Sequence, residues 1–326
     1  MRSLSAILLT VAFAVSAAHA DDKKPKKKDD PSQIGNRDVG KGVNFYSIER
    51  EIALGKQLAQ EVTREAKLNT DPLISEYVNR LGQNLARNSD AMVPFTFQVI
   101  EGEAPNAFAL PGGYIFVYTG LLRLADEEDE AAGAIAHEIA HVAARHMTRQ
   151  ATKGQIVNIA SIPLSVLLGG WGGVAARQAA GVAVPMTFLK FSRSDETEAD
   201  YLGVQYMYAA GYDPNGAVTI FEKLEALQRT KPGLATKLFS THPMDSDRID
   251  KTQKEIDRIL PSKLEYVVTT SEYHDMRDRL IALENRRKNE VNDGRPRLRV
   301  APGAGKPDQQ DEKDERPTIR RRDLVD

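Results

Sequence analysis

Residues 131–146 read AAGAIAHEIAHVAARH, and this stretch contains the pattern His-Glu-x-x-His. The small side chains that precede the pattern predict a helix whose backbone can lie close to other elements. His137 and His141 are four residues apart, so they differ by about 40° around a helix and both imidazoles can reach one metal ion from one face. Glu138 lies next to His137, where its carboxylate can reach a water molecule without binding the ion. The stretch therefore predicts a helix that holds a metal ion and carries a carboxylate beside it.

A catalytic zinc site keeps one position for water, so a third protein ligand is needed. His146 is nine residues after His137 and points about 180° away on a continuous helix, so we expect it to pack at the helix end. A second predicted helix offers carboxylates: Glu196 and Asp200 share one face of it, and Glu198 faces elsewhere. We expect Glu196 to bind zinc and Asp200 to accept the free N–H of His137. The alternative is an acidic helix start that only complements the helix dipole.

The spacing of apolar residues predicts an α+β fold that is mainly helical and contains a small sheet. A Pro-Gly-Gly turn at 111–113 joins two strands, and we expect the strand after it to be an exposed edge beside the metal-binding helix. That helix is expected to begin at Asp126 as its N-cap. The predicted helices cover 44–67, 72–87, 126–150, 194–210, 215–227, 245–260 and 271–287, and the predicted strands cover 93–100, 107–110 and 114–118.

Composition excludes several classes of protein. The 326 residues include 44 Lys and Arg against 46 Asp and Glu, which gives a net charge of −2 and argues against a nucleic-acid partner. The chain has no cysteine, so it has no thiol nucleophile, no cysteine-ligated metal and no disulfide. A chain of this length has room for one large domain or two small ones.

The two ends of the chain differ in composition from its middle. Residues 1–20 combine a basic start, an apolar run and Ala-His-Ala, which predicts a signal peptide cleaved after Ala20 and export to the periplasm; an uncleaved anchor is the alternative. Residues 21–42 are rich in Lys and Asp and predict a disordered leader, and 289–326 predict a disordered tail of mixed charge. The domain between them is predicted to cover 43–288.

Residues 154–176 carry no charged side chain and are long enough to span a bilayer. Pro163, several glycines and three polar residues interrupt the run, which favours a buried or lid-like pair of helices. Peripheral membrane contact through this segment is the alternative.

Three motifs together resemble the gluzincin metallopeptidase family of the CAAX prenyl protease, HtpX and mitochondrial Oma. They are HExxH at 137–141, ExxxD at 196–200, and Ser-Thr-His-Pro at 240–243 followed by Arg248; the segment 106–120 is also similar. The resemblance covers about 43–260 and is closest to soluble periplasmic members such as the BepA protease domain and LoiP. The sequence has no transmembrane helices of the CAAX or HtpX kind and no helical-repeat C-terminal domain such as BepA carries, so prenylated substrates and barrel-assembly partners are not implied.

The resemblance implies a zincin-like core and a zinc-dependent endopeptidase of the cell envelope, with one Zn²⁺ per chain. It would hydrolyse unfolded or misassembled envelope proteins, with Glu138 as general base. His242 would stabilise the oxyanion, and Arg248 would complete the catalytic group by supporting the site. The related periplasmic members also suggest that the loop carrying His242 can fold over the zinc and keep the enzyme latent. From the residues alone, His242 is a turn residue before a proline and Arg248 a surface charge.

A peptide substrate is expected to pair with the strand at 114–118, because an exposed edge gives affinity without sequence preference. The substrate-binding candidates are Asn106, Tyr114, Ile115 and Phe116, although Ile115 is explained equally well as a core residue. Two other functions stay open. One is a periplasmic chaperone or adaptor that keeps the protease fold with little turnover, and the other is a protein with a structural zinc ion. The metal-binding residues together with Glu138 favour the enzyme.

Overall fold

The computed structural model describes residues 27–40, 42–153, 191–230, 242 and 246–293. The predicted signal peptide, the uncharged segment 154–176 and most of the predicted tail lie outside these residues. The chain divides into two compact units, Met1–Leu283 and Glu284–Asp326. The described part of the second unit is the end of helix α11 (Ser271–Asp293), which extends beyond the helix end predicted at residue 287.

The described helices are mostly those that the sequence predicts, and the α+β, mainly helical fold is confirmed. They are α1 (Ile48–Glu65), α2 (Pro72–Arg87), α3 (Thr119–Leu124), α4 (Glu128–Ala143), α5 (His146–Thr152), α7 (Arg193–Ala210), α8 (Asn215–Thr230), α10 (Ser246–Ile259) and α11. Local signals fix their ends. The Asp71 carboxylate accepts a hydrogen bond from Leu73 N–H at the start of α2, and Ser192 and Asp195 form a capping box at the start of α7. Helix α3 was not predicted.

The sheet has three strands, β1 (Thr96–Ile100), β2 (Ala107–Leu110) and β3 (Tyr114–Tyr118), in the order β1-β3-β2. β3 runs parallel to β1 and antiparallel to β2, with which it forms the predicted hairpin. The prediction that 114–118 is an exposed edge is therefore wrong, because β3 is the central strand. The turn residues predict the hairpin, but the pairing of β3 with β1 depends on packing between distant segments. The outer strand that packs against α4 is β2.

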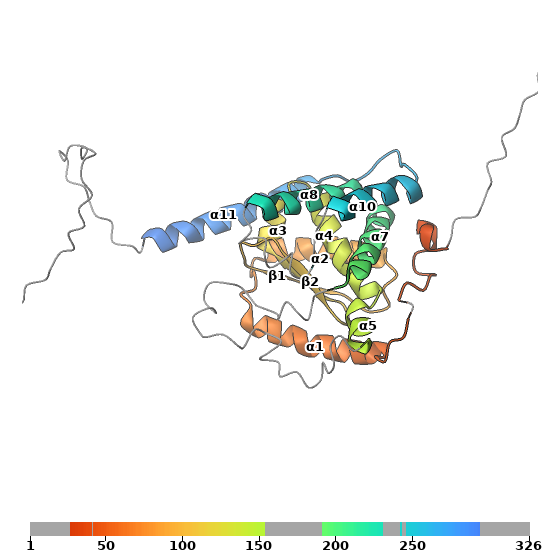
Figure 1. Ribbon diagram of the computed structural model, residues 1–326. Helices are drawn as coiled ribbons and strands as arrows, with labels where there is room; N and C mark the ends of the chain where they lie inside the picture. The colour runs from red at the N-terminus through yellow and green to blue at the C-terminus, as the bar shows by residue number, and fades with distance from the viewer. Residues whose placement is uncertain (1–26, 41, 154–190, 231–241, 243–245, 294–326) are drawn as a thin grey trace, which may run out of the picture. The chain divides into compact units, whose positions relative to one another are not determined.

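The sheet separates two hydrophobic cores, because side chains alternate between the faces of each strand. The larger core takes the odd-numbered strand positions: Phe97, Val99, Ala107, Ala109, Ile115 and Val117. The smaller core takes the even-numbered ones: Ile100, Phe108, Leu110, Phe116 and Tyr118. Figure 1 shows α1 and α5 below the sheet and α7, α8 and α10 above it. Helix α4 lies between the two groups of helices and packs against β2.

The metal-binding helix predicted over 126–150 is in fact two helices. α4 ends at Ala143 and α5 begins at His146, because Arg145 between them adopts a left-handed backbone conformation with φ 56°. The Arg145 side chain is held by Glu51 of α1, whose Oε1 accepts a hydrogen bond from Arg145 Nε at 2.7 Å. Nothing in the local sequence marks this break, since arginine has no preference for positive φ.

Helix α4 also begins later than predicted. Its N-cap is Glu127, whose side chain makes no capping hydrogen bond. The predicted cap, Asp126, instead accepts a hydrogen bond from Lys223 Nζ at 2.6 Å. The small residues of α4 allow the expected close packing, because a Cβ added at Gly133 would lie 2.7 Å from the Cα atom of Ala217 in α8.

Part of the leader predicted to be disordered is ordered. Residues 27–40 include two short 3₁₀ helices, η1 (Lys27–Asp29) and η2 (Pro31–Gln33). Arg37 Nε forms an ion pair of 2.8 Å with Asp90, and both side chains are almost fully buried. The Asp90 carboxylate also accepts a hydrogen bond from the hydroxyl of Tyr206 in α7. Composition predicts disorder for a charged segment, but here a buried charge has a partner of opposite sign.

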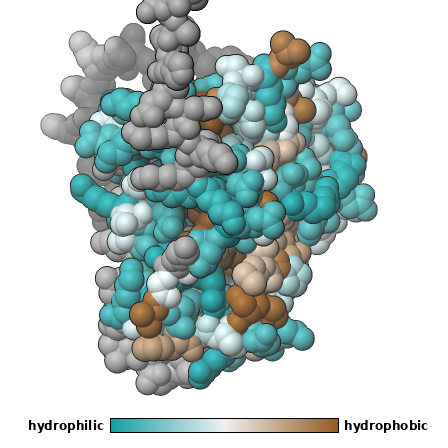
Figure 2. Space-filling model, turned by 90° about the vertical axis from the view of Figure 1, so that its right-hand side faces the viewer, coloured by the Kyte–Doolittle hydropathy of each residue, from teal (hydrophilic) through white to brown (hydrophobic). Residues whose placement is uncertain are grey.

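The face shown in Figure 2 is mostly hydrophilic, with hydrophobic residues gathered in small separate patches. The large hydrophobic side chains that are most exposed on the described residues include Val43, Phe45 and Met92. Within the described part of the chain, no helix combines the length and the apolar character needed to cross a membrane.

Candidate metal centre

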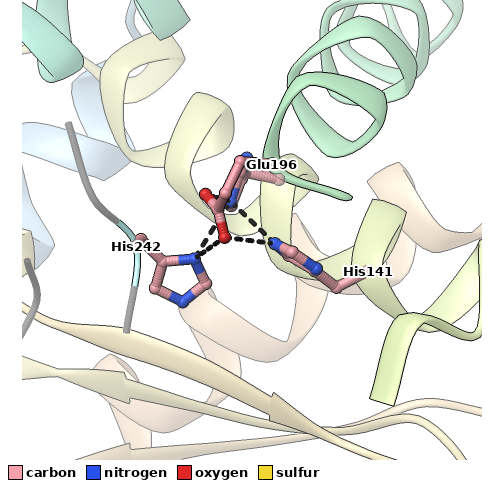
Figure 3. Close-up of side chains that lie close together, drawn as sticks. His141, Glu196 and His242 are labelled. Atoms are coloured by element: carbon pink, nitrogen blue, oxygen red, sulfur yellow. Dashed lines mark hydrogen bonds and ion pairs between the residues drawn. The ribbon is translucent and has the colours of Figure 1, made fainter. Parts of the chain in front are cut away.

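Four buried side chains from separate parts of the chain meet at one point. Helix α4 supplies His137 and His141, α7 supplies Glu196, and His242 comes from the segment between α8 and α10. His137 Nε2 lies 3.0 Å from His141 Nε2 and 3.3 Å from His242 Nδ1. Glu196 Oε1 lies 3.0 Å from His242 Nδ1 and 3.5 Å from His141 Nε2, as Figure 3 shows.

These separations fit a metal ion. Two ligands that each lie about 2.0–2.1 Å from a tetrahedral ion are about 3.3 Å apart, close to what is observed. His137 Nδ1 lies 2.8 Å from Asp200 Oδ1, and a proton held there leaves Nε2 facing the other ligands. His141 Nε2 faces the same point, so either a shared proton or a metal ion can lie between the two nitrogens. Imidazole nitrogens with a carboxylate oxygen are a donor set that suits zinc.

Two buried groups support His137 and Glu196. Arg248 donates hydrogen bonds from Nε and Nη2 to the two oxygens of Asp200, at 2.7 and 2.8 Å. Its Nη1 lies 2.8 Å from Glu196 Oε2. Burial alone would lower the pKa of His137, but the contacts with Asp200 and Glu196 raise it to about 10. The structure thus places Asp200 against His137, where the sequence predicts it, and places Arg248 on the two carboxylates.

Glu138 lies beside the cluster and faces β2. The residue is 3% exposed, and its carboxylate accepts a hydrogen bond from the backbone of Ala109. Its Oε1 lies 3.5 Å from His242 Nε2, and its Oε2 has no hydrogen-bond partner among the described residues. Burial raises the pKa of Glu138, although the neighbouring His242 and His137 act in the opposite direction. A carboxylate with a raised pKa and a free oxygen suits a general base.

A small pocket of about 30 Å³ opens beside these residues. Its lining includes Glu138 and His242 together with Ala107 from β2 and Phe221 from α8. A mainly apolar pocket with few polar groups is typical of a substrate-binding site.

The predicted substrate-binding residues do not line this pocket, although one of them, Asn106, directly precedes Ala107, which does. Ile115 and Phe116 are buried in the two cores, and Tyr114 packs against the smaller one. All three belong to the central strand β3, so neither side of their backbone is free to pair with a peptide. Asn106 directly precedes β2, is 9% exposed, and its Oδ1 has no partner among the described residues.

His146 packs at a helix end and lies outside the metal cluster, as predicted, but not in the direction that a continuous helix gives. The break at Arg145 brings His146 Nδ1 to 2.9 Å from His141 Nδ1. Glu198, which faces away from the metal cluster as predicted, lies 3.1 Å from His146 Nε2. Phe191 was also missed: its ring stacks on the imidazole of His141, with centroids 4.0 Å apart. No signal in the sequence marks these contacts, because they depend on the broken helix.

The chain matches one protein family model and several curated relatives. The family model described as Peptidase family M48 matches residues 72–256, which include the sheet, α4, α7 and His242. A curated relative from Vibrio cholerae, named putative beta-barrel assembly-enhancing protease, is 32% identical over 249 residues, which cover 72% of this chain and 49% of the relative.

Two further relatives agree with this match. The beta-barrel assembly-enhancing protease of Escherichia coli is 27% identical over 295 residues, covering 86% of this chain and 58% of the relative. The mitochondrial metalloendopeptidase OMA1 of Schizosaccharomyces pombe is 35% identical over 206 residues, covering 61% of this chain and 57% of the relative. The chain spans about half the length of the curated relatives it matches.

Proposed function

The chain belongs to peptidase family M48, and we propose that it is a zinc-dependent endopeptidase with His137, His141 and Glu196 as its metal ligands. The observation that carries this proposal is the convergence of two imidazole nitrogens and the Glu196 carboxylate at one buried point. The raised pKa of the adjacent Glu138 supports an enzyme rather than a structural metal site.

A bound zinc ion would polarise the scissile carbonyl and lower the pKa of water to about 7. Glu138 would accept a proton from the attacking water and pass it to the leaving amine. The backbone hydrogen bond from Ala109 orients the Glu138 carboxylate and leaves one oxygen available. Arg248 fixes Glu196 and Asp200 and so acts on the ligands rather than on the substrate.

For His242 we propose two positions. In this structure its Nδ1 lies within the donor set, and a fourth protein ligand would close the site as in a structural zinc centre. This arrangement supports the latent state expected from the sequence. When His242 leaves the ion, its imidazole is available to stabilise an oxyanion. We expect His242→Ala to speed exchange of the metal with a chelator, measured by stopped flow; unchanged exchange together with unchanged peptide cleavage would exclude the latent state.

For substrate binding we propose the outer edge of β2 in place of β3. Tyr118 N–H donates to Asn106 C=O, so the antiparallel pattern directs the backbone groups of Ala107 and Ala109 away from β3. Because the N–H of Ala109 already donates to Glu138, an extended peptide would add to this edge through Ala107, next to Glu138. Replacing Asn106 with Ala should then raise KM for a peptide more than it lowers zinc content, and the reverse order would contradict the edge model.

We propose that the substrates are unfolded or misassembled proteins of the cell envelope. Pairing with a strand edge reads the peptide backbone, which suits a protease without strong sequence preference. The signal-peptide pattern of residues 1–20 supports a periplasmic location. Two relatives are named for assembly of β-barrels, which is compatible with quality control in the envelope.

The main test compares the full chain without its signal peptide with its Glu138→Gln variant. Zinc is measured by metal analysis, and cleavage is measured on casein. We expect about one zinc in both proteins and cleavage only by the wild type. A chaperone or adaptor would suppress aggregation of an unfolded protein equally in both and cleave it in neither. A structural zinc protein would show no cleavage and would unfold when chelated.

A further inference from the structure

The two histidines of α4 differ in what their second ring nitrogen contacts. His137 Nδ1 lies against a carboxylate, that of Asp200. His141 Nδ1 instead lies 2.9 Å from Nδ1 of another imidazole, His146, which is fully buried. His146 Nε2 in turn lies 3.1 Å from Oε2 of Glu198. The contacts therefore form a chain from His141 through His146 to Glu198.

The protons in this chain have one consistent arrangement. If His141 binds a metal ion through Nε2, its proton is on Nδ1 and must be donated. His146 Nδ1 is then the acceptor, so the proton of His146 is on Nε2 and is donated to Glu198. The guanidinium of Arg149 lies 3.2 Å from the same Glu198 oxygen and favours a carboxylate that accepts this proton.

The backbone before His146 brings it to this position. On a continuous helix a residue five positions after His141 would lie about 140° away from it. The left-handed conformation of Arg145 changes that direction, and α5 starts immediately afterwards. Glu51, which is 3% exposed, holds Arg145 by hydrogen bonds to Nε and Nη2 at 2.7 and 2.6 Å. An unfavourable backbone conformation in a non-glycine residue needs such support from its surroundings.

We propose that His146 is a positioning residue for the metal ligand His141: it fixes the tautomer and orientation of that imidazole, and Glu198 together with the left-handed turn at Arg145 fixes His146. This inference rests on the proposed zinc-peptidase function. Partners that orient a metal-binding histidine typically change metal affinity by about 10–100-fold when they are lost.

A second metal ion is the competing explanation, because His146, Asp195 and Glu198 also lie close together. Two observations favour positioning. Asp195 Oδ2 accepts hydrogen bonds from Ser192 as part of the helix cap. Glu198 Oε2 lies 3.2 Å from Arg149 Nη1, and that positive charge opposes a cation at the same carboxylate.

The first experiment replaces His146 in the full chain and measures zinc affinity by competition with a chelator. His146→Phe keeps a ring but removes both nitrogens, and we expect zinc to bind about 10–100-fold more weakly. His146→Asn keeps an acceptor near the position of Nδ1 and should restore most of the affinity. The absorption spectrum of the Co²⁺-loaded protein should change in His146→Phe and return towards that of the wild type in His146→Asn.

Glu198→Ala extends the test to a half-exposed position where substitution leaves the core intact. It removes the acceptor of His146 Nε2, and we expect a loss of affinity smaller than in His146→Phe but in the same direction. This variant keeps the inference testable if His146→Phe fails to fold.

A second pair of variants tests the turn. Arg145→Gly and Arg145→Val both lose the contacts with Glu51, but glycine adopts positive φ freely and valine does not. We therefore expect Arg145→Gly to bind zinc more tightly than Arg145→Val. Equal affinities would show that the turn does not control the site.

The outcomes separate this inference from the proposed function. If the wild type binds no zinc or does not cleave peptides, the proposed function fails. If the wild type binds one zinc and is active but neither His146→Phe nor Glu198→Ala changes the affinity or the Co²⁺ spectrum, the positioning role fails. Two zinc ions in the wild type, falling to one in Glu198→Ala, would overturn it in favour of a second metal site.

Discussion

The two halves of α4 both carry buried glutamates, but their surroundings differ. In the first turn, Glu128 accepts a hydrogen bond from the hydroxyl of Tyr212 at 2.8 Å, and Glu130 pairs with Lys223 at 2.7 Å. Further along the helix, Glu138 is buried to the same degree, yet one of its oxygens has no partner among the described residues. Glu128 and Glu130 therefore have hydrogen-bond donors or a cation beside them, whereas one oxygen of Glu138 has neither among the described residues.

This difference separates carboxylates that stabilise the fold from one that is available for chemistry. A buried polar group without a partner costs free energy, so it persists where function requires it. Burial raises the pKa of Glu138, and a raised pKa makes a carboxylate a stronger proton acceptor. The degree of burial is therefore a poor guide to function, and the number of hydrogen-bond partners is a better one.

The largest effect should come from replacing a glutamate with leucine in each half of α4, Glu128 in the first turn and Glu138 further along. Glu138→Leu should lower turnover by about 10²–10⁴-fold, the contribution of a general base, while the free energy of unfolding stays the same or rises. Glu128→Leu should cost about 1–3 kcal/mol of stability, because the hydroxyls of Tyr212 and Thr270 lose their acceptor. Peptide cleavage and chemical denaturation of the two variants measure both effects. Loss of stability in Glu138→Leu as large as in Glu128→Leu would remove the distinction.

The second prediction concerns Lys223 of α8, whose ammonium group pairs with Glu130 in the first turn of α4. Lys223→Met keeps the length of the side chain but leaves Glu130 buried without its positive partner. We expect a loss of about 1–3 kcal/mol in the free energy of unfolding, with zinc affinity unchanged because the substitution lies away from the histidines. Urea denaturation and chelator competition provide the two measurements. A change in zinc affinity without a change in stability would contradict the assignment.

The sequence predicted the features of the fold and of the site that depend on local signals. The periodicity of α2, α7, α8 and α10 and the turn before β3 were sufficient to locate those elements, because caps and apolar spacing are local signals. The placement of His137, His141, Glu196 and Asp200 on shared helix faces followed from helix geometry alone.

The errors at the break in the metal-binding helix, in the sheet and at the helix start all concern contacts between distant segments. The break at Arg145 depends on Glu51, 94 residues earlier, and no local rule predicts a left-handed arginine. The reading of β3 as an edge failed because β1 pairs on its other side. Residue Asp126 has the chemistry of an N-cap, but Lys223 of α8 takes its carboxylate. Composition and spacing do not contain this information.

The last prediction is a pH dependence from Asp129, which lies between Glu128 and Glu130 in the first turn. Burial raises its pKa to about 7, and the negative charges of Asp213 and Glu130 act in the same direction. In the unfolded chain the carboxyl ionises near its ordinary value of about 3.9.

Between these two values the native state binds more protons than the unfolded state, so this group makes stability fall as pH rises from about 4 to about 7, with no further change above that. Asp129→Asn removes the ionisable group. Its free energy of unfolding relative to the wild type should therefore rise across that interval and then become constant. Denaturation curves of both proteins recorded from pH 4 to pH 8 measure this difference. A constant difference between Asp129→Asn and the wild type would mean that the pKa of Asp129 is not raised in the folded protein. The first turn of α4 would then differ from Glu138, whose pKa burial raises.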